Sequence, residues 1–398
     1  METCTTVPDA DPGPSWQVGV IWMGGSLPGL LRLFLRHRAQ IPLKAFPACL
    51  FDLCCGAFNS TLGLLQDLTL KARVARVALE DDPLFVIGHW RTGTTLIHEL
   101  LALDPRHRCP TTYECFAPHH FLISYRWLRP LIRFVLPTNR FADNMRMDWD
   151  YPQEDEFALC NLGLPSPYWN LAFPDVEPPF PGAFTLDDLT VTERARWRRG
   201  LLTFLKQLTW RKPGRLVLKS PTHTFRLPTL HELFPRARYV HVLRDPYAVF
   251  ASTIHLWTRL QTAQGYHPPT GAGREQQVLD TFCRMHQRLD ETRGLIAPER
   301  FCDIRYEDLI RAPVAEMRRV YGQLQLGNFE SLAPAVEAYF RDRATYQPNR
   351  HQVSRAQREA VTRRWLPLVA KYGYRACREA AAGSEQATPG LSQQPDAG

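Results

Sequence analysis

An α/β fold with a parallel sheet and helices on both faces is predicted by two features of this 398-residue chain. From residue 83 onward, short apolar runs alternate with segments of helical periodicity, which is typical of a parallel sheet covered by helices. A polar turn flanked by glycines follows the first apolar run. In open α/β sheets such a turn binds an anionic group at the start of the next helix. The sequence therefore predicts a P-loop-type sheet.

The expected elements follow one another in the order strand, helix, strand. Asp245 and Pro246 support one helix start directly, because Asp is a good N-cap residue and Pro suits the first helical position. The expected strands are 83–87, 215–218, 237–243 and 301–305, and the expected helices are 94–103, 222–233, 246–260 and 315–324.

The first 80 residues read as an N-terminal helical extension, with helical segments at 30–35 and 46–70. This apolar region, flanked by Arg36 and Arg38, fits a helical cap on the main domain or a segment lying on a membrane surface. We expect the first 15 residues to be flexible and 377–398 to be a disordered tail, because both are rich in small and breaking residues. The predicted division is 1–80, 81–376 and 377–398.

Composition narrows the possible classes of protein. The formal charge is +8, from 48 Lys plus Arg against 40 Asp plus Glu, and the Arg residues are scattered. That distribution suits a small anionic ligand, and with no nucleic-acid module present we expect no nucleic acid as partner. The ten Cys form no C-x-x-C pair, so no metal site is predicted. No long apolar run or secretory signal is evident, so we expect a cytoplasmic protein with peripheral membrane contact as an option.

The glycine-flanked turn spans Gly88 to Thr95. Gly88 and Gly93 have the separation found in nucleotide triphosphatases, G-x-x-x-x-G-K-[ST], but Thr94 stands where those proteins have Lys. The cation lies earlier in the turn, at Arg91. The turn therefore has the shape of a phosphate-binding loop without its usual lysine.

A second cluster of anion-binding residues follows the expected strand 237–243. Arg244 would emerge at the carboxyl edge of the sheet, where ligands bind in open α/β folds. Ser252 follows eight residues later, on the next helix, and Tyr306 ends a later strand in the sequence Tyr306-Glu307-Asp308.

Together these segments resemble the sulfotransferases that use 3′-phosphoadenosine 5′-phosphosulfate, PAPS. That family has a loop of the form (Lys or Arg)-x-Gly-Thr-Thr, matched by 91–95, then a strand-end Arg with Ser eight residues on, and then Tyr-Glu-Asp. The resemblance covers roughly residues 83 to 325. It is closest to the bacterial-type branch related to protein-tyrosine sulfotransferases.

The resemblance implies PAPS as co-substrate, no metal, and roles for particular residues. Arg91 would stabilise charge on the leaving oxygens, and Lys219 would polarise the leaving group. The resemblance assigns the 3′-phosphate to Arg244 and Ser252. Nucleotide contacts would come from Arg91, Thr92, Gly93, Thr94, Thr95 and Tyr306, with Arg350 as a candidate for the nucleotide's outer face.

The base that accepts the proton of the acceptor hydroxyl stays open between two residues. Glu114 lies 23 residues beyond Arg91, close to where tyrosine sulfotransferases carry a catalytic Glu. His223 follows Lys219, as a His follows the corresponding Lys in cytosolic members. The acidic run Glu154-Asp155-Glu156 is interpreted as a solvated helix start, with a place in the wall of the acceptor pocket or a bound cation as alternatives.

The acceptor is not specified by sequence, so carbohydrate, lipid and peptide hydroxyls, or an amine, remain open. Two other functions compete with sulfuryl transfer. The spacing of Gly88 and Gly93 would fit a P-loop phosphotransferase or kinase, and the apolar first 80 residues would fit a non-catalytic nucleotide-binding protein at a membrane.

Overall fold

A parallel five-stranded sheet forms the centre of the computed structural model, which describes residues 20–135, 148–343 and 353–374. The strand order is β2-β3-β1-β4-β5, and every pairing is parallel, as predicted. The predicted flexible start, the predicted tail and Arg350 lie outside the described residues. The strands are β1 (Leu84–Gly88), β2 (His107–Arg108), β3 (Arg215–Lys219), β4 (Arg238–Leu243) and β5 (Phe301–Arg305).

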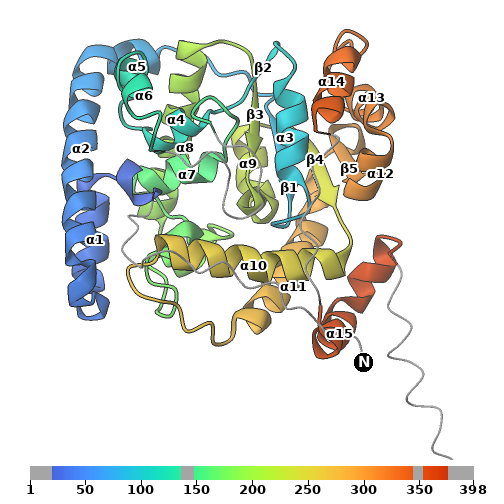
Figure 1. The fold of residues 1–398 in the computed structure, drawn as a ribbon. Helices are drawn as coiled ribbons and strands as arrows, with labels where there is room; N and C mark the ends of the chain where they lie inside the picture. The colour runs from blue at the N-terminus through green and yellow to red at the C-terminus, as the bar shows by residue number, and fades with distance from the viewer. Residues whose placement is uncertain (1–19, 136–147, 344–352, 375–398) are drawn as a thin grey trace, which may run out of the picture.

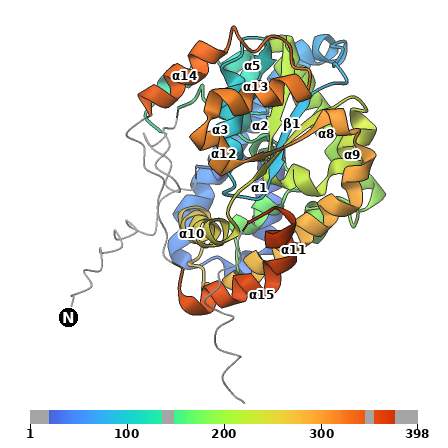
Figure 2. The same cartoon turned by 90° about the vertical axis from the view of Figure 1, so that its right-hand side faces the viewer.

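Helices cover both faces of this sheet. Successive side chains of a strand point to opposite faces, and in β1 Leu84 and Val86 join one apolar cluster while Phe85 and Ile87 join the other. The first face is packed against α3 (Thr94–Ala102), α13 (Pro313–Gln323) and α14 (Ala333–Asp342). The second is packed against α8 (Val191–Arg211), α9 (Leu227–Leu233) and α11 (Arg274–Thr292), and Figure 2 shows the two layers on either side of β1.

The strand register brings the predicted ligand-binding residues to one edge. Gly88 is level with Val242, and Leu243 is level with Arg305. Arg244 and Tyr306 are therefore the first residues beyond two neighbouring strand ends. The phosphate-type turn leaves β1 between β3 and β4, where the chain reverses its direction of travel across the sheet. Such a switch point is the usual ligand crevice of an open α/β sheet.

Most predicted elements are present, with two clear differences. The two-residue strand β2 was not expected, and one expected helix is divided. The expected helix 222–233 is two elements, a 3-10 helix at Pro221–Phe225 and then α9. Pro228 explains the break, because a proline has no amide hydrogen for the bond to the carbonyl four residues earlier and is tolerated only in the first turn of a helix. The remaining helices at this end are α10 (Pro246–Gln264), α12 (Tyr306–Arg311) and α15 (Arg355–Lys371).

The N-terminal helices pack onto the main body. They are α1 (Leu27–Arg36) and the 30-residue α2 (Phe46–Ala75), which forms the left edge of Figure 1. The Trp22 indole donates to the Gln264 carbonyl over 2.6 Å, and the Ser26 amide donates to the Asn161 carbonyl over 3.1 Å. The extension therefore shares one core with the domain that it covers.

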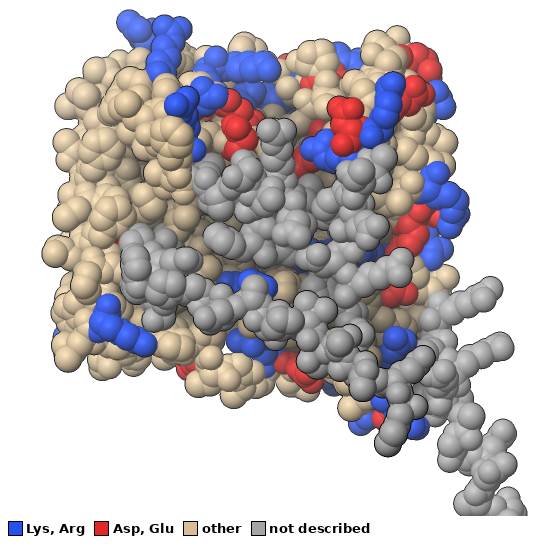
Figure 3. All heavy atoms as spheres, viewed as in Figure 1, with Lys and Arg blue, Asp and Glu red and all other residues tan. Residues whose placement is uncertain are grey.

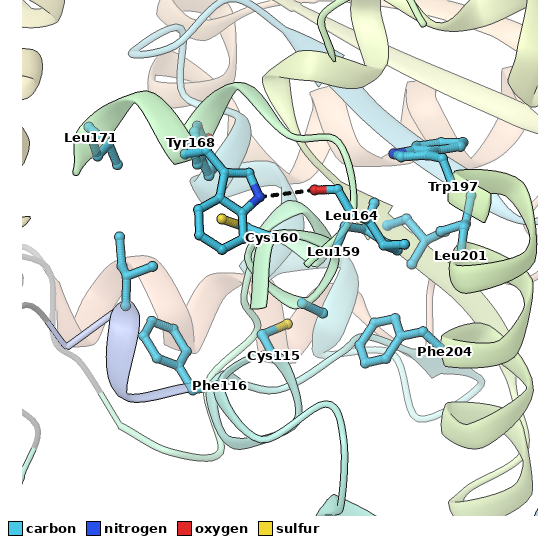
Figure 4. Packing of buried hydrophobic residues seen from close by; sticks show 14 of the residues in the cluster. Cys115, Phe116, Leu159, Cys160, Leu164, Tyr168, Leu171, Trp197, Leu201 and Phe204 are labelled. Carbon is cyan, nitrogen blue, oxygen red and sulfur yellow. Dashed lines mark hydrogen bonds between the residues drawn. The ribbon is translucent and has the colours of Figure 1, made fainter. Parts of the chain in front are cut away.

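Part of this shared core is shown in Figure 4. Cys115 and Cys160 are fully buried free thiols among apolar neighbours that include Phe116 and Trp197. These two cysteines serve as small core residues.

Candidate active site

The turn after β1 adopts a strained conformation that opens toward β4 and β5. Gly88, Arg91 and Gly93 all have positive φ, at 138°, 70° and 102°. A left-handed φ is unusual for an arginine and is typical of functional turns. Gly93 is required by close approach as well, since a Cβ there would lie 2.4 Å from the Tyr306 ring.

The residues expected to hold the nucleotide converge at this turn. Arg91 Nε donates to Ser252 Oγ over 2.7 Å, and Arg244 donates to the Arg91 carbonyl over 3.0 Å. The Arg244 guanidinium also lies 4.3 Å from the centre of the Tyr306 ring. One basic cluster thus joins residues that span more than 200 positions of the chain: Arg91, Arg244, Ser252 and the aromatic ring of Tyr306.

The Tyr-Glu-Asp segment has a second, structural contribution. Glu307 accepts a hydrogen bond from the Asp245 amide over 2.8 Å and another from the Tyr374 hydroxyl over 2.9 Å. Asp245 itself accepts from the Ala248 amide over 2.9 Å and so caps α10 as predicted. These bonds fix the turn that carries Arg244 against the start of α12.

Three consecutive carboxylates pair with three basic side chains, one at the end of β3 and two in the segment after it. Glu154 pairs with Lys219 at 2.6 Å, Asp155 with His223 at 2.8 Å, and Glu156 with Arg226 at 2.5 Å. Asp155 and Glu156 begin α7 (Asp155–Asn161). All these residues are almost fully buried, and buried charges are tolerated only when they are paired.

We expected from the sequence that this acidic run would be exposed to solvent, and that expectation is wrong. Asp155 and Glu156 begin a helix whose start is buried, and Glu154 is linked through its partners to the turn after β1. Their partners lie four and three residues apart in Lys219-Ser-Pro-Thr-His223-Thr-Phe-Arg226 and follow the same order as the three acids. Three acidic residues followed later by three basic residues in the same order are the sequence signal that could have revealed the pairing.

Glu154 connects this network to the turn. Its second oxygen accepts a hydrogen bond from the Tyr168 hydroxyl over 2.6 Å, and that hydroxyl accepts from the Trp90 indole over 3.1 Å. On the other side, Lys219 Nζ lies 3.4 Å from Thr95 Oγ1. Burial beside Glu154 raises the pKa of Tyr168 well above its usual value, so the phenol stays a donor. Glu154 is thus linked to the turn on both sides, through Tyr168 to Trp90 and through Lys219 to Thr95.

His223, one of the two expected bases, is enclosed within the protein. Its ring packs edge-on against Phe85, 5.3 Å between centroids, and its Nδ1 has no hydrogen-bond partner among the described residues. Burial alone would raise the pKa of Asp155, but the charge and hydrogen bond of His223 hold that pKa below its usual value. This geometry favours a structural role for His223, that of holding α7 against β3.

Glu114, the other expected base, is saturated with donors. It lies in α4 (Thr112–Phe116), where Arg108 and Arg211 both bond to Oε1, the latter at 2.6 Å. The amide and hydroxyl of Thr111 bond to Oε2 at 2.8 and 3.0 Å. A carboxylate has about four acceptor sites, so these four donors leave Glu114 no free lone pair for a substrate proton.

A parallel sheet with a lysine-free anion-binding turn, a basic cluster at the neighbouring strand ends and a buried carboxylate facing that turn defines a nucleotide-dependent group transferase. Among the described residues, no group of three or more His, Cys, Asp or Glu side chains could hold a metal ion.

The chain belongs to the sulfotransferase family, whose model matches residues 83–331. It is 41% identical over 354 residues to omega-hydroxy-beta-dihydromenaquinone-9 sulfotransferase Stf3 of Mycobacterium bovis, covering 89% of this chain and 91% of that one. It is also 32% identical to human carbohydrate sulfotransferase 6, over 64% of this chain and 65% of the relative.

Solved structures agree on the fold. Sulfotransferase STF9 of Mycobacterium avium has a TM-score of 0.62 at 22% identity, covering 79% of this chain and 82% of that one. Sulfotransferase STF1 of Mycobacterium tuberculosis has a TM-score of 0.57 at 20% identity, covering 85% and 90%. The protein is a sulfotransferase enzyme, as the Arg91, Arg244 and Tyr306 segments predicted, and not a phosphotransferase or a non-catalytic binding protein.

Proposed function

We propose that this sulfotransferase transfers the sulfuryl group of PAPS to a hydroxyl group of a polyprenyl quinone lipid. The donor is supported by the convergence of Arg91, Arg244, Ser252 and Tyr306 on one turn. The acceptor class is supported by the mycobacterial relative, whose name gives a hydroxylated dihydromenaquinone.

The basic cluster provides for two separate phosphate groups. The amides of the turn from Arg91 to Thr95 stand at the N-terminus of α3, which favours the 5′-phosphosulfate. Arg244 and Ser252 supply the 3′-phosphate contact, and Tyr306 offers a ring face to the nucleotide. This division of roles explains why two arginines are needed in one small region.

Glu154 is the base that the geometry favours. Two donors, Lys219 and Tyr168, occupy its carboxylate, so about two of its four acceptor sites remain for an acceptor hydroxyl. PAPS supplies a sulfuryl group whose bond to the 5′-phosphate oxygen breaks as the acceptor oxygen bonds to sulfur. Glu154 takes the hydroxyl proton in that step.

Lys219 is placed between the base and the turn. Its ammonium contacts Glu154 on one side and approaches Thr95 on the other. Positive charge at that point stabilises the negative charge that develops on the leaving oxygen. Because the amine is almost completely buried, its electrostatic effect is stronger than in water.

The proposed acceptor is tested by a transfer assay with ³⁵S-labelled PAPS. We expect label in a polyprenyl quinol that carries a hydroxyl on its chain, and none in the same quinol without that hydroxyl. Label in oligosaccharides and not in the quinol would replace the lipid acceptor by a carbohydrate. An absence of transfer to every hydroxyl acceptor, with bisphosphate binding intact, would leave only the nucleotide half of the proposal standing.

A further inference from the structure

The long helix α2 has its polar and apolar sides inverted with respect to a typical helix on a soluble protein. Asp52, Asn59 and Gln66 recur every seven residues on the side that faces the protein body, and all three are buried. Asp52 accepts from the Tyr266 hydroxyl over 2.7 Å, Asn59 donates to the Gly25 carbonyl over 3.0 Å, and Gln66 accepts from the Leu122 amide over 2.9 Å. The inner side of α2 is therefore polar and bonded to the body.

The outer side of α2 is apolar and exposed. Leu50, Leu65 and Leu68 are exposed by 64%, 50% and 86%. Before Lys71 the ionisable Asp, Glu, Lys and Arg residues of the helix are two, the buried Asp52 and the exposed Asp67. A helix on a soluble protein normally turns its apolar stripe inward. An outward stripe on a 30-residue helix, roughly 45 Å long, marks an interaction surface.

Neighbouring elements extend this apolar face. α1 adds Leu31 and Leu35 beside α2. At the other end, α5 (Phe121–Ser124) is tied to α2 through Gln66, and the adjoining α6 (Leu128–Leu131) lies at the same edge of the molecule in Figure 1. The exposed apolar side chains around α6 are Trp127, Leu131, Phe134 and Val135.

Basic side chains border the apolar face at both ends. Residues 20–51 contain no Asp or Glu. In Figure 3 uncharged atoms run along the edge formed by α1 and α2, with Lys and Arg near its upper and lower ends. The exposed basic residues are Arg32, Arg36, Arg38 and Lys44 toward the start of α2, Lys71, Arg73 and Arg76 toward its end, and Arg126 and Arg133 beside α6.

We infer that this face, formed by the outer sides of α1 and α2 and by α6, docks the enzyme onto an anionic lipid bilayer with α2 lying flat in the interface. An apolar stripe bordered by Lys and Arg is complementary to acyl chains beneath anionic headgroups. The inference rests on this surface alone and holds whatever the acceptor is.

Two other occupants fit this face less well. Among the described residues, Leu43–Ala75 is long and apolar enough to cross a membrane, but its inner side is bonded to the body along its length, so α2 cannot cross alone. A second copy of the chain would bring two basic borders together in a symmetric interface, where like charges repel.

The docking surface is tested by co-sedimentation with vesicles of equal parts phosphatidylglycerol and phosphatidylcholine. We compare the wild type with Leu50→Glu/Leu65→Glu on α2. The matched control is Ile310→Glu/Leu366→Glu, which adds the same charge at similarly exposed positions, 45% each, on α12 and α15 across the molecule. Thermal unfolding and bisphosphate binding establish that each variant is folded.

We expect the wild type and the control to sediment with these vesicles and the α2 variant to lose at least about tenfold in partitioning, because two charges must enter an apolar interface. Equal sedimentation of the folded α2 variant and the wild type would overturn the inference. So would a wild type that ignores vesicles but forms a dimer that the α2 variant abolishes, since the face would then bind a second copy.

Discussion

Two buried glutamates of this enzyme, Glu114 and Glu154, are both paired with basic residues but differ in how completely they are satisfied. Glu114 receives four donors from Arg108, Arg211 and Thr111. Glu154 receives two, from Lys219 and Tyr168, and these contacts lead back to the turn after β1. The number of donors, more than burial or charge, is the reason that we propose Glu154 and not Glu114 as the base.

The largest expected effect is on catalysis by Glu154→Gln. We expect kcat to fall by about 10²- to 10⁴-fold, because a general base is lost, while the affinity for adenosine 3′,5′-bisphosphate stays at the wild-type value. Steady-state kinetics and calorimetry measure the two quantities. The control is Glu156→Gln, which breaks the neighbouring buried pair without touching the turn. A kcat loss that is equal in both variants would show that Glu154 acts only through the fold.

The second largest expected effect is a loss of unfolding free energy in Glu114→Gln. Removing one partner of a buried ion pair typically costs about 3–5 kcal/mol, and here two arginines lose their carboxylate. We expect denaturant unfolding to show a loss of that order, with kcat near the wild-type value at temperatures where the variant is folded. A stable variant with a large loss of kcat would return the role of base to Glu114.

A third buried carboxylate, Asp52, extends the comparison to a group that accepts one side-chain hydrogen bond among the described residues, from the Tyr266 hydroxyl. Burial raises the pKa of Asp52 to about 7. Because the folded-state pKa exceeds the unfolded value near 4, stability is greatest at low pH and falls as pH rises from about 4 to 7. Relative to Asp52→Asn, we expect the wild type to lose about 2–3 kcal/mol of unfolding free energy between pH 5 and 8. Parallel pH profiles for the two proteins would show that Asp52 is not protonated in the fold.

Local sequence signals were enough for four of the five strands and for the residues that converge at the turn after β1. Strand 301–305 and the Asp245 cap depend on neighbours in sequence, and Gly93 and Arg244 stand in short motifs. These features depend on residues that are close together in the sequence, so long-range packing does not alter them.

The partners of Glu154 and the direction of α2 depend on long-range packing. Glu154 and Lys219 are 65 residues apart, and nothing in the acidic run itself shows that it is buried. The apolar positions of α2 predict a helix but not which side faces the body. Its buried Asp52, Asn59 and Gln66 become intelligible only through their partners on other elements.

The central claim, that one basic cluster holds both ends of a doubly phosphorylated nucleotide, is tested most directly by calorimetry of adenosine 3′,5′-bisphosphate and 5′-AMP with wild type and Arg244→Ala. A lost charge-assisted bond of about 1.5–3 kcal/mol corresponds to roughly 10- to 100-fold in affinity. We expect Arg244→Ala to weaken the bisphosphate by that factor and to leave 5′-AMP nearly unchanged. Equal weakening of both ligands, or a wild type that does not distinguish them, would contradict the claim.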